Sequence, residues 1–132
     1  MEHIVDLDRA AERITARAPH WHAAGLVVGA LTWRADGAPW PQPLETDRSR
    51  VADPDSVGVE VVDPRTGAEL HVVLFRGGWA DVDYLARDWA VEGSAAHEGE
   101  TAGVGVLPAQ GIVSDADFEE RLIAWTGEVF GG

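Results

Sequence analysis

Hydrophobic and polar residues alternate most clearly in the middle of the chain, between residues 56 and 85. Three β-rich segments, at 57–62, 69–75 and 79–85, are separated by two stretches of turn-forming residues. The first stretch reads Asp-Pro-Arg-Thr-Gly and the second contains Gly77-Gly78. Short alternating segments divided by such turns are typical of an antiparallel meander, in which each strand pairs with the next.

The alternation also divides the meander into two faces, because successive side chains of a strand point to opposite sides of its sheet. One face is apolar and is expected to form the core; its residues are Val59, Leu70, Val72, Val82 and Tyr84. On the third strand the opposite side carries Trp79, Asp81 and Asp83. We expect that side to face solvent.

Two amphipathic helices are predicted, one on either side of the meander. Residues 6–18 have apolar residues at helical spacing, and Asp6 or Asp8 can serve as the N-cap. Pro19 disfavours helical geometry in the residue before it, so the helix is expected to end near Arg17. The second helix starts at Ser114, which is followed by acidic residues suited to a first turn. Its apolar stripe consists of Phe118, Leu122, Ile123, Trp125 and Val129.

The remaining segments complete the predicted fold. Residues 26–33 form a continuous apolar run that predicts one buried strand, and 104–107 predict an edge strand. Residues 34–55 are rich in proline and 93–101 are acidic, so both are expected to be loops. We therefore expect a single α+β domain over 1–132: an antiparallel meander of four to five strands, packed with an N-terminal and a C-terminal helix as a two-layer sandwich.

Composition narrows the class of partner. The formal net charge is −13, so nucleic acid and anionic membrane surfaces are not expected partners, whereas a basic protein is. The chain has no cysteine, no apolar stretch long enough for a membrane span and no basic leader, which favours the cytoplasm. All ten basic residues are Arg, and Asn is also absent; this bias indicates a GC-rich genome and suggests an actinobacterial source.

Histidines offer one candidate metal site. His20 and His22 flank Trp21, and on a strand both imidazoles would share a face, with His71 or the His97-Glu98 pair as a further ligand. The pattern lacks the acidic residue that follows the two histidines in cupin-type sites. The alternative interpretation is a surface pair beside a buried tryptophan. No cofactor is predicted.

Asp81, Asp83 and the tryptophans offer a candidate binding surface. The two carboxylates lie about 7 Å apart on one strand face, which suits a basic residue of a partner better than catalysis. Trp33 and Trp125 lie in apolar segments and are expected in the core, whereas Trp40, Trp79 and Trp89 lie in loops or polar segments. They are either interface residues or clamps that hold the long loop to the sheet. No nucleotide-binding, serine-hydrolase or Cys–His motif is present, so no catalytic residue is predicted.

Three segments of the meander resemble a known family. They read Ser-Val-Gly-Val-Glu at 56–60, Glu-Leu-His-Val-Val-Leu-Phe at 69–75 and Gly-Trp-Ala-Asp-Val-Asp at 78–83. Together with the order of helix, meander and helix, they resemble the tryptophan-bearing immunity proteins of actinobacterial polymorphic toxin systems called TriTu. The resemblance covers about a third of the chain. It implies binding and neutralising a cognate toxin domain, and it implies no catalytic residues.

The first hypothesis is therefore an acidic immunity or antitoxin protein that binds a basic toxin or effector domain. Its expected contacts are Trp79, Asp81, Asp83 and Trp40, with Glu98 and Glu100 steering the encounter. The alternative is a small enzyme or ligand-binding domain with a His-based metal site between the 34–55 loop and the sheet. A subunit of a larger assembly is a third possibility. The sequence leaves the oligomeric state open.

Overall fold

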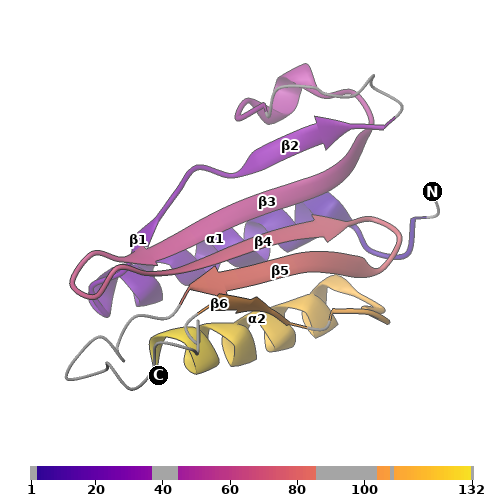
Figure 1. Cartoon of the computed structure of the whole chain (residues 1–132). Helices are drawn as coiled ribbons and strands as arrows, with labels where there is room; N and C mark the ends of the chain where they lie inside the picture. The colour runs from indigo at the N-terminus through magenta and orange to yellow at the C-terminus, as the bar shows by residue number, and fades with distance from the viewer. Residues whose placement is uncertain (1–2, 37–44, 86–103, 108, 132) are drawn as a thin grey trace.

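The computed structural model describes residues 3–36, 45–85, 104–107 and 109–131, and it confirms the α+β fold. Two helices and an antiparallel sheet form two layers (Figure 1). In chain order the elements are α1 (Leu7–Ala23), β1 (Val27–Val28), β2 (Thr32–Ala35), the 3-10 helix η1 (Arg48–Arg50), β3 (Pro54–Asp63), β4 (Ala68–Phe75), β5 (Trp79–Leu85), β6 (Val104–Val106) and α2 (Asp115–Phe130). Neither helix is long and apolar enough to cross a membrane.

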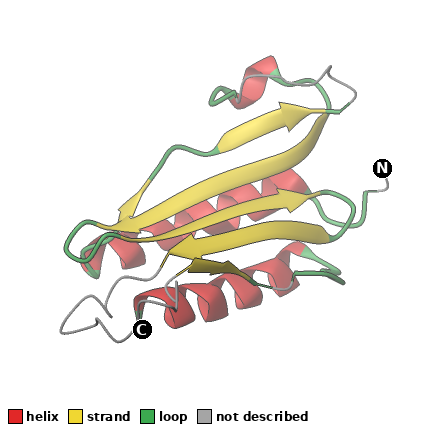
Figure 2. Ribbon diagram, in the orientation of Figure 1, coloured by secondary structure: helices red, strands yellow, loops and turns green. Residues whose placement is uncertain are grey.

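The predicted meander is confirmed as β3, β4 and β5, which lie side by side in the sheet. β1 and β2 both pair with the outer edge of β3, and β6 pairs with β5, as expected of the 104–107 segment. The two helices lie on the same side of this sheet (Figure 2). They contact each other, and α1 also contacts β3 while α2 contacts β4.

The register places the predicted core residues in rows across the three central strands. Val59 pairs with Val72, which pairs with Val82; all three side chains are buried beneath the helices. The next row joins Val61, Leu70 and Tyr84. Because these rows interdigitate with the apolar stripes of α1 and α2, the sheet has one helix-covered face.

Helix α1 does not end where the sequence predicts. It begins after Asp6, whose side chain accepts a hydrogen bond from the Arg9 amide, but it continues through Pro19 to Ala23. A proline inside a helix removes one backbone donor and typically costs about 3 kcal/mol. The last turn is nevertheless formed because Trp21 packs into the core with 3% of its surface exposed. Tertiary packing therefore overrides the local preference against helix at this position.

The apolar run at 26–33 is also not the single buried strand that the sequence predicts. It is divided into β1 and β2, with Gly29, Ala30 and Leu31 between them. The pairing with β3 shifts by one residue across this break, from Val28↔Val61 to Thr32↔Gly58. Only part of the run reaches the core, since Val27 is 54% exposed.

The second helix is confirmed with its predicted cap. The Ser114 hydroxyl accepts a hydrogen bond from the Asp117 amide at 3.0 Å, and Gly131 ends the helix in the left-handed conformation with a φ of 78°. Arg13 of α1 bridges the two helices by pairing with Asp115 and, at 2.5 Å, with Glu119. The helix layer is thus joined at its surface as well as through the core.

Candidate functional site: the open face of the sheet

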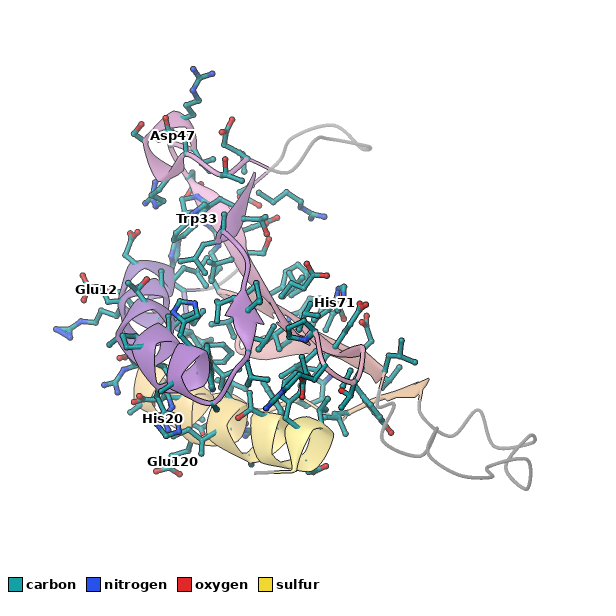
Figure 3. All side chains as sticks on the ribbon, turned by 90° about the vertical axis from the view of Figure 1, so that its left-hand side faces the viewer. Glu12, His20, Trp33, Asp47, His71 and Glu120 are labelled. Carbon is teal, nitrogen blue, oxygen red and sulfur yellow. The ribbon has the colours of Figure 1, made fainter. Side chains whose placement is uncertain are left out.

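Within the described part of the chain, one face of the sheet has no helix against it, and we call it the open face. By alternation and register it is formed on the central strands by the residues opposite the core rows: Ser56, Gly58, Glu60, Val62, Glu69, His71, Val73, Phe75, Trp79, Asp81, Asp83 and Leu85. Figure 3 shows His71 on this side of the sheet, away from α1 and α2. The face combines four carboxylates with several apolar side chains.

Asp81 and Asp83 are exposed on the open face, as predicted. They alternate with Ala80 and Val82, which are buried beneath the helices. In the register Asp81 lies opposite Val73 and Asp83 lies opposite His71. The meander thereby holds two carboxylates at a fixed spacing of about 7 Å on β5.

Trp79 is half-buried rather than fully exposed. Its ring stacks on the buried Phe75 with centroids 3.9 Å apart and planes 12° from parallel, and Arg34 lies 6.0 Å from the Phe75 centroid. This stack fixes the indole in one orientation before any partner binds. A rigid aromatic side chain loses little conformational entropy on binding, so Trp79 is well placed to act as an anchor.

A second group of polar residues, Glu60, Glu69 and His71, lies beside the two aspartates. The sequence did not predict that these three side chains come together. His71 Nε2 lies 3.1 Å from a Glu60 carboxylate oxygen and 3.0 Å from a Glu69 carboxylate oxygen. Glu60 faces His71 across the β3–β4 pair, and Glu69 lies two residues before it on β4. The spacing of Glu69 and His71 was readable in the sequence, but the partnership with Glu60 depends on the register.

The open face is hollowed next to this group. Gly29, Thr32, Gly58, Glu60 and His71 are among the residues that line a depression of about 280 Å³. Gly58 lets the Thr32 hydroxyl approach the floor of this hollow closely, because a Cβ atom there would lie 2.6 Å from that hydroxyl. The hollow is large enough to receive a side chain of another molecule.

The alternative metal site on His20 and His22 rested on a strand that the structure does not contain. Both residues are exposed in the last turn of α1, where positions i and i+2 point about 200° apart around the helix axis. Figure 3 shows His20 on the helix side of the molecule and His71 on the opposite side. The strand-based prediction that His20 and His22 share a face is therefore wrong.

The other predicted site residues divide into two groups. Trp33 and Trp125 are buried in the core, as is Trp21 between the two histidines, so these predictions are confirmed. The remaining candidates lie outside the described residues; they are Trp40, Trp89, His97, Glu98 and Glu100. Their predicted roles stay predictions.

Several aspartates outside the open face have lowered pKa values, each for a structural reason. A hydrogen bond from Arg65 lowers the pKa of Asp63 at the β3–β4 turn, and one from Arg13 lowers the pKa of Asp115 at the start of α2. The Val113 amide and then Arg121 lower the pKa of Asp117. These carboxylates hold turns and helix ends in place, so their perturbation indicates stability rather than catalysis.

Charged residues near the start of β3 and the end of β4 also stabilise the fold. Arg76 follows β4 and is 5% exposed; it pairs with Asp53 at 2.8 Å and with Asp36 at 3.0 Å. Arg34 pairs with the buried Asp55 at 3.2 Å. These contacts join the start of β3 to its neighbours. Removing either partner of such a pair would destabilise the fold, because it leaves an uncompensated charge in the protein interior.

Comparisons with protein-family models, with curated proteins and with solved structures gave no match.

Proposed function

We propose that this protein is an acidic inhibitor of the immunity or antitoxin kind, which binds a basic domain of a partner through the open face of its sheet. The observation that carries the proposal is the position of Trp79, Asp81 and Asp83 together on a sheet face that no helix of the described residues covers. An aromatic anchor beside fixed carboxylates is the combination expected for recognising arginine- or lysine-rich surfaces.

The apolar residues of the open face would supply most of the binding energy. Val73 is on β4, which lies between β3 and β5, the strand that carries the two aspartates. Trp79 stacks on Phe75 where β4 turns into β5. Hot spots of this kind are most effective when they are surrounded by polar residues that exclude water. Asp81 lies directly opposite Val73 and two residues from Trp79, and Asp83 follows on the same face, so these two carboxylates provide that polar surround.

The charge of the whole protein would act at longer range. A net charge of −13 attracts a positively charged partner and speeds its encounter, while the local carboxylates select the orientation. Toxins that act on nucleic acids need a basic cleft for their polyanionic substrate. An acidic protein seated in that cleft inhibits by occupying it, without chemistry of its own.

The same proposal includes where the protein acts and the kind of organism that produces it. An immunity protein acts where its toxin would otherwise do damage, which places this chain in the cytoplasm of the producing, actinobacterial cell. The partner would then be encoded next to its gene, as the C-terminal domain of a large secreted protein.

The test is to purify the toxin domain encoded by the neighbouring gene and measure its association with this protein at low and high salt. We expect the association rate to fall about tenfold or more between roughly 0.02 M and 0.3 M salt, because the Debye length shortens over that range. Asp81→Asn with Asp83→Asn should flatten this dependence, and Glu12→Gln with Glu120→Gln on the helix side should flatten it less. An association rate independent of salt would refute electrostatic steering.

A further inference from the structure

Three potential metal ligands converge on the open face. The Nε2 atom of His71 and one carboxylate oxygen each of Glu60 and Glu69 all lie within 4.8 Å of one another. The two separations from Nε2 are 3.1 Å to Glu60 and 3.0 Å to Glu69. Within the described part of the chain, no other three His, Cys, Asp or Glu residues converge in this way.

These separations match the spacing of ligands around a small divalent ion. Two donors bound to a tetrahedral ion at 2.0–2.1 Å are about 3.4 Å apart, so the observed nitrogen–oxygen separations need to open by only a few tenths of an ångström. Imidazole nitrogen and carboxylate oxygen are both zinc ligands. The donors also come from two adjacent central strands, whose backbone positions are fixed by the β3–β4 pairing.

All three side chains are partly exposed, so water reaches them, but within the protein they share a single donor. A neutral imidazole has at most one N–H at Nε2, so a single donor must serve both Glu60 and Glu69. The two carboxylate oxygens lie within 4.8 Å of each other and repel each other. A divalent cation can contact all three groups at once and offsets both negative charges.

We propose that Glu60, Glu69 and His71 form a zinc site with three protein ligands and a remaining position open to solvent or to a partner. The hollow lined by Gly29, Gly58, Glu60 and His71 adjoins the ligands and provides room for that position. A site with three protein ligands and one open position can bind water or accept a donor from another molecule. The zinc site shares the open face with the proposed interface but does not depend on it.

Asp83 is the residue best placed to support His71 from outside the ligand set. It lies directly opposite His71 in the β4–β5 pair, where facing Cβ atoms are about 5 Å apart. Zinc-bound histidines usually donate their second ring N–H to a carboxylate or a carbonyl, which fixes the ring orientation. We therefore assign Asp83 as a positioning residue for His71.

The test is titration of the chelator-treated protein with ZnCl₂, followed by calorimetry and by NMR of the imidazole nitrogens. We expect one zinc per chain, with the Nε2 resonance of His71 shifting while those of the other histidines stay. His71→Ala should weaken binding by at least about 100-fold, since loss of outer-shell partners alone costs 10–100-fold. Glu60→Gln and Glu69→Gln should each weaken it, and Asp83→Asn should weaken it less.

The matched control is His22→Ala, which removes an exposed histidine from α1 and should leave the affinity unchanged within about twofold. Millimolar MgCl₂ should not displace the zinc, because magnesium prefers oxygen ligands and retains its waters. Failure of the wild-type protein to bind zinc at 0.1 mM, or equal binding by His71→Ala, would overturn the proposal. Because no partner is present in the titration, that failure would leave the proposed interface untouched. Circular dichroism of each variant without metal shows that the fold is retained.

Discussion

Val72 and Val73 provide a matched test of the two faces of the sheet, because they are identical neighbours on β4 that point in opposite directions. Val72 is 1% exposed and lies in the row with Val59 and Val82 beneath the helices. Val73 is half-buried on the open face, opposite Asp81. Truncating each to Ala changes the intrinsic strand preference equally, so the difference between the two variants reports what covers each face.

The expected costs follow from burial. At Val72 the loss of two methyl groups removes about 1.6 kcal/mol of transfer free energy, and a residual cavity of roughly 40 Å³ adds about 1 kcal/mol, for a total of about 2.5 kcal/mol. At Val73 about half of the transfer free energy is lost and no closed cavity forms, which gives about 0.8 kcal/mol. The predicted difference in unfolding free energy is therefore about 1.7 kcal/mol.

Urea unfolding measures both free energies directly, and thermal unfolding provides a second readout. With 132 residues, the unfolding entropy near the midpoint is about 0.28 kcal/mol/K, so Val72→Ala should lower Tm by about 9 °C and Val73→Ala by about 3 °C. Equal costs, or a larger cost at Val73, would mean that the open face is covered in solution. The proposed interface would then lose its structural basis.

Three further predictions concern individual contacts. Gly58→Ala should cost about 1–3 kcal/mol in urea unfolding, because its Cβ would lie 2.6 Å from the Thr32 hydroxyl; adding Thr32→Ala should recover much of the loss, and no recovery would refute the steric cause. Because Arg13 lowers the folded-state pKa of Asp115, this carboxylate stabilises the protein above its unfolded pKa near 3.9 and loses that effect as pH falls through the lower folded value. The difference in unfolding free energy between wild type and Arg13→Gln should therefore be largest at pH 7 and should disappear below about pH 4. A difference that grows in acid would contradict the stabilising role of the Arg13–Asp115 pair. Pro19→Ala should raise the unfolding free energy by about 1–3 kcal/mol by restoring a helical donor, and a lower value would show that the last turn of α1 requires the proline.

The regular parts of the fold were predictable from the sequence because local and tertiary preferences agree there. In β3, β4 and β5 the alternation, the glycine-containing turns and the burial of Val59, Val72 and Val82 all point to the same meander. The same agreement marks α2, where the Ser114 cap precedes a stripe that is buried almost as expected; Ile123 is the exception, at 40% exposed.

The errors occur where tertiary packing overrides local sequence. Pro19 predicts a helix end near Arg17, but burial of Trp21 extends α1 to Ala23. That extension places His20 and His22 on a helix, which removes the strand geometry that their proposed metal site required. The run at 26–33 is uniformly apolar, and its break at Gly29–Leu31 is decided by how β1 and β2 pair with β3.

The candidate site was predictable only in part. Asp81, Asp83 and Trp79 could be assigned to one face because they share a strand, and alternation within one strand needs no tertiary information. Glu60 and His71 belong to different strands, and their contact depends on a register that a shift of one residue would destroy. The stacking of Trp79 on Phe75 depends in the same way on the β4–β5 turn.

Charge reversal on the two sides of the molecule tests the central claim, that the open face binds a basic partner. The measurement is the affinity of the proposed basic partner domain for Asp81→Arg/Asp83→Arg and for Glu12→Arg/Glu120→Arg. The two pairs change the net charge equally; the first lies on the open face with His71 and the second on the helix side (Figure 3). We predict a loss of at least about 100-fold for the open-face pair, because like charges placed together in an interface cost several kcal/mol, and a loss within about threefold for the helix-side pair. Equal losses, or a larger loss for the helix-side pair, would contradict the assignment of the open face as the binding surface.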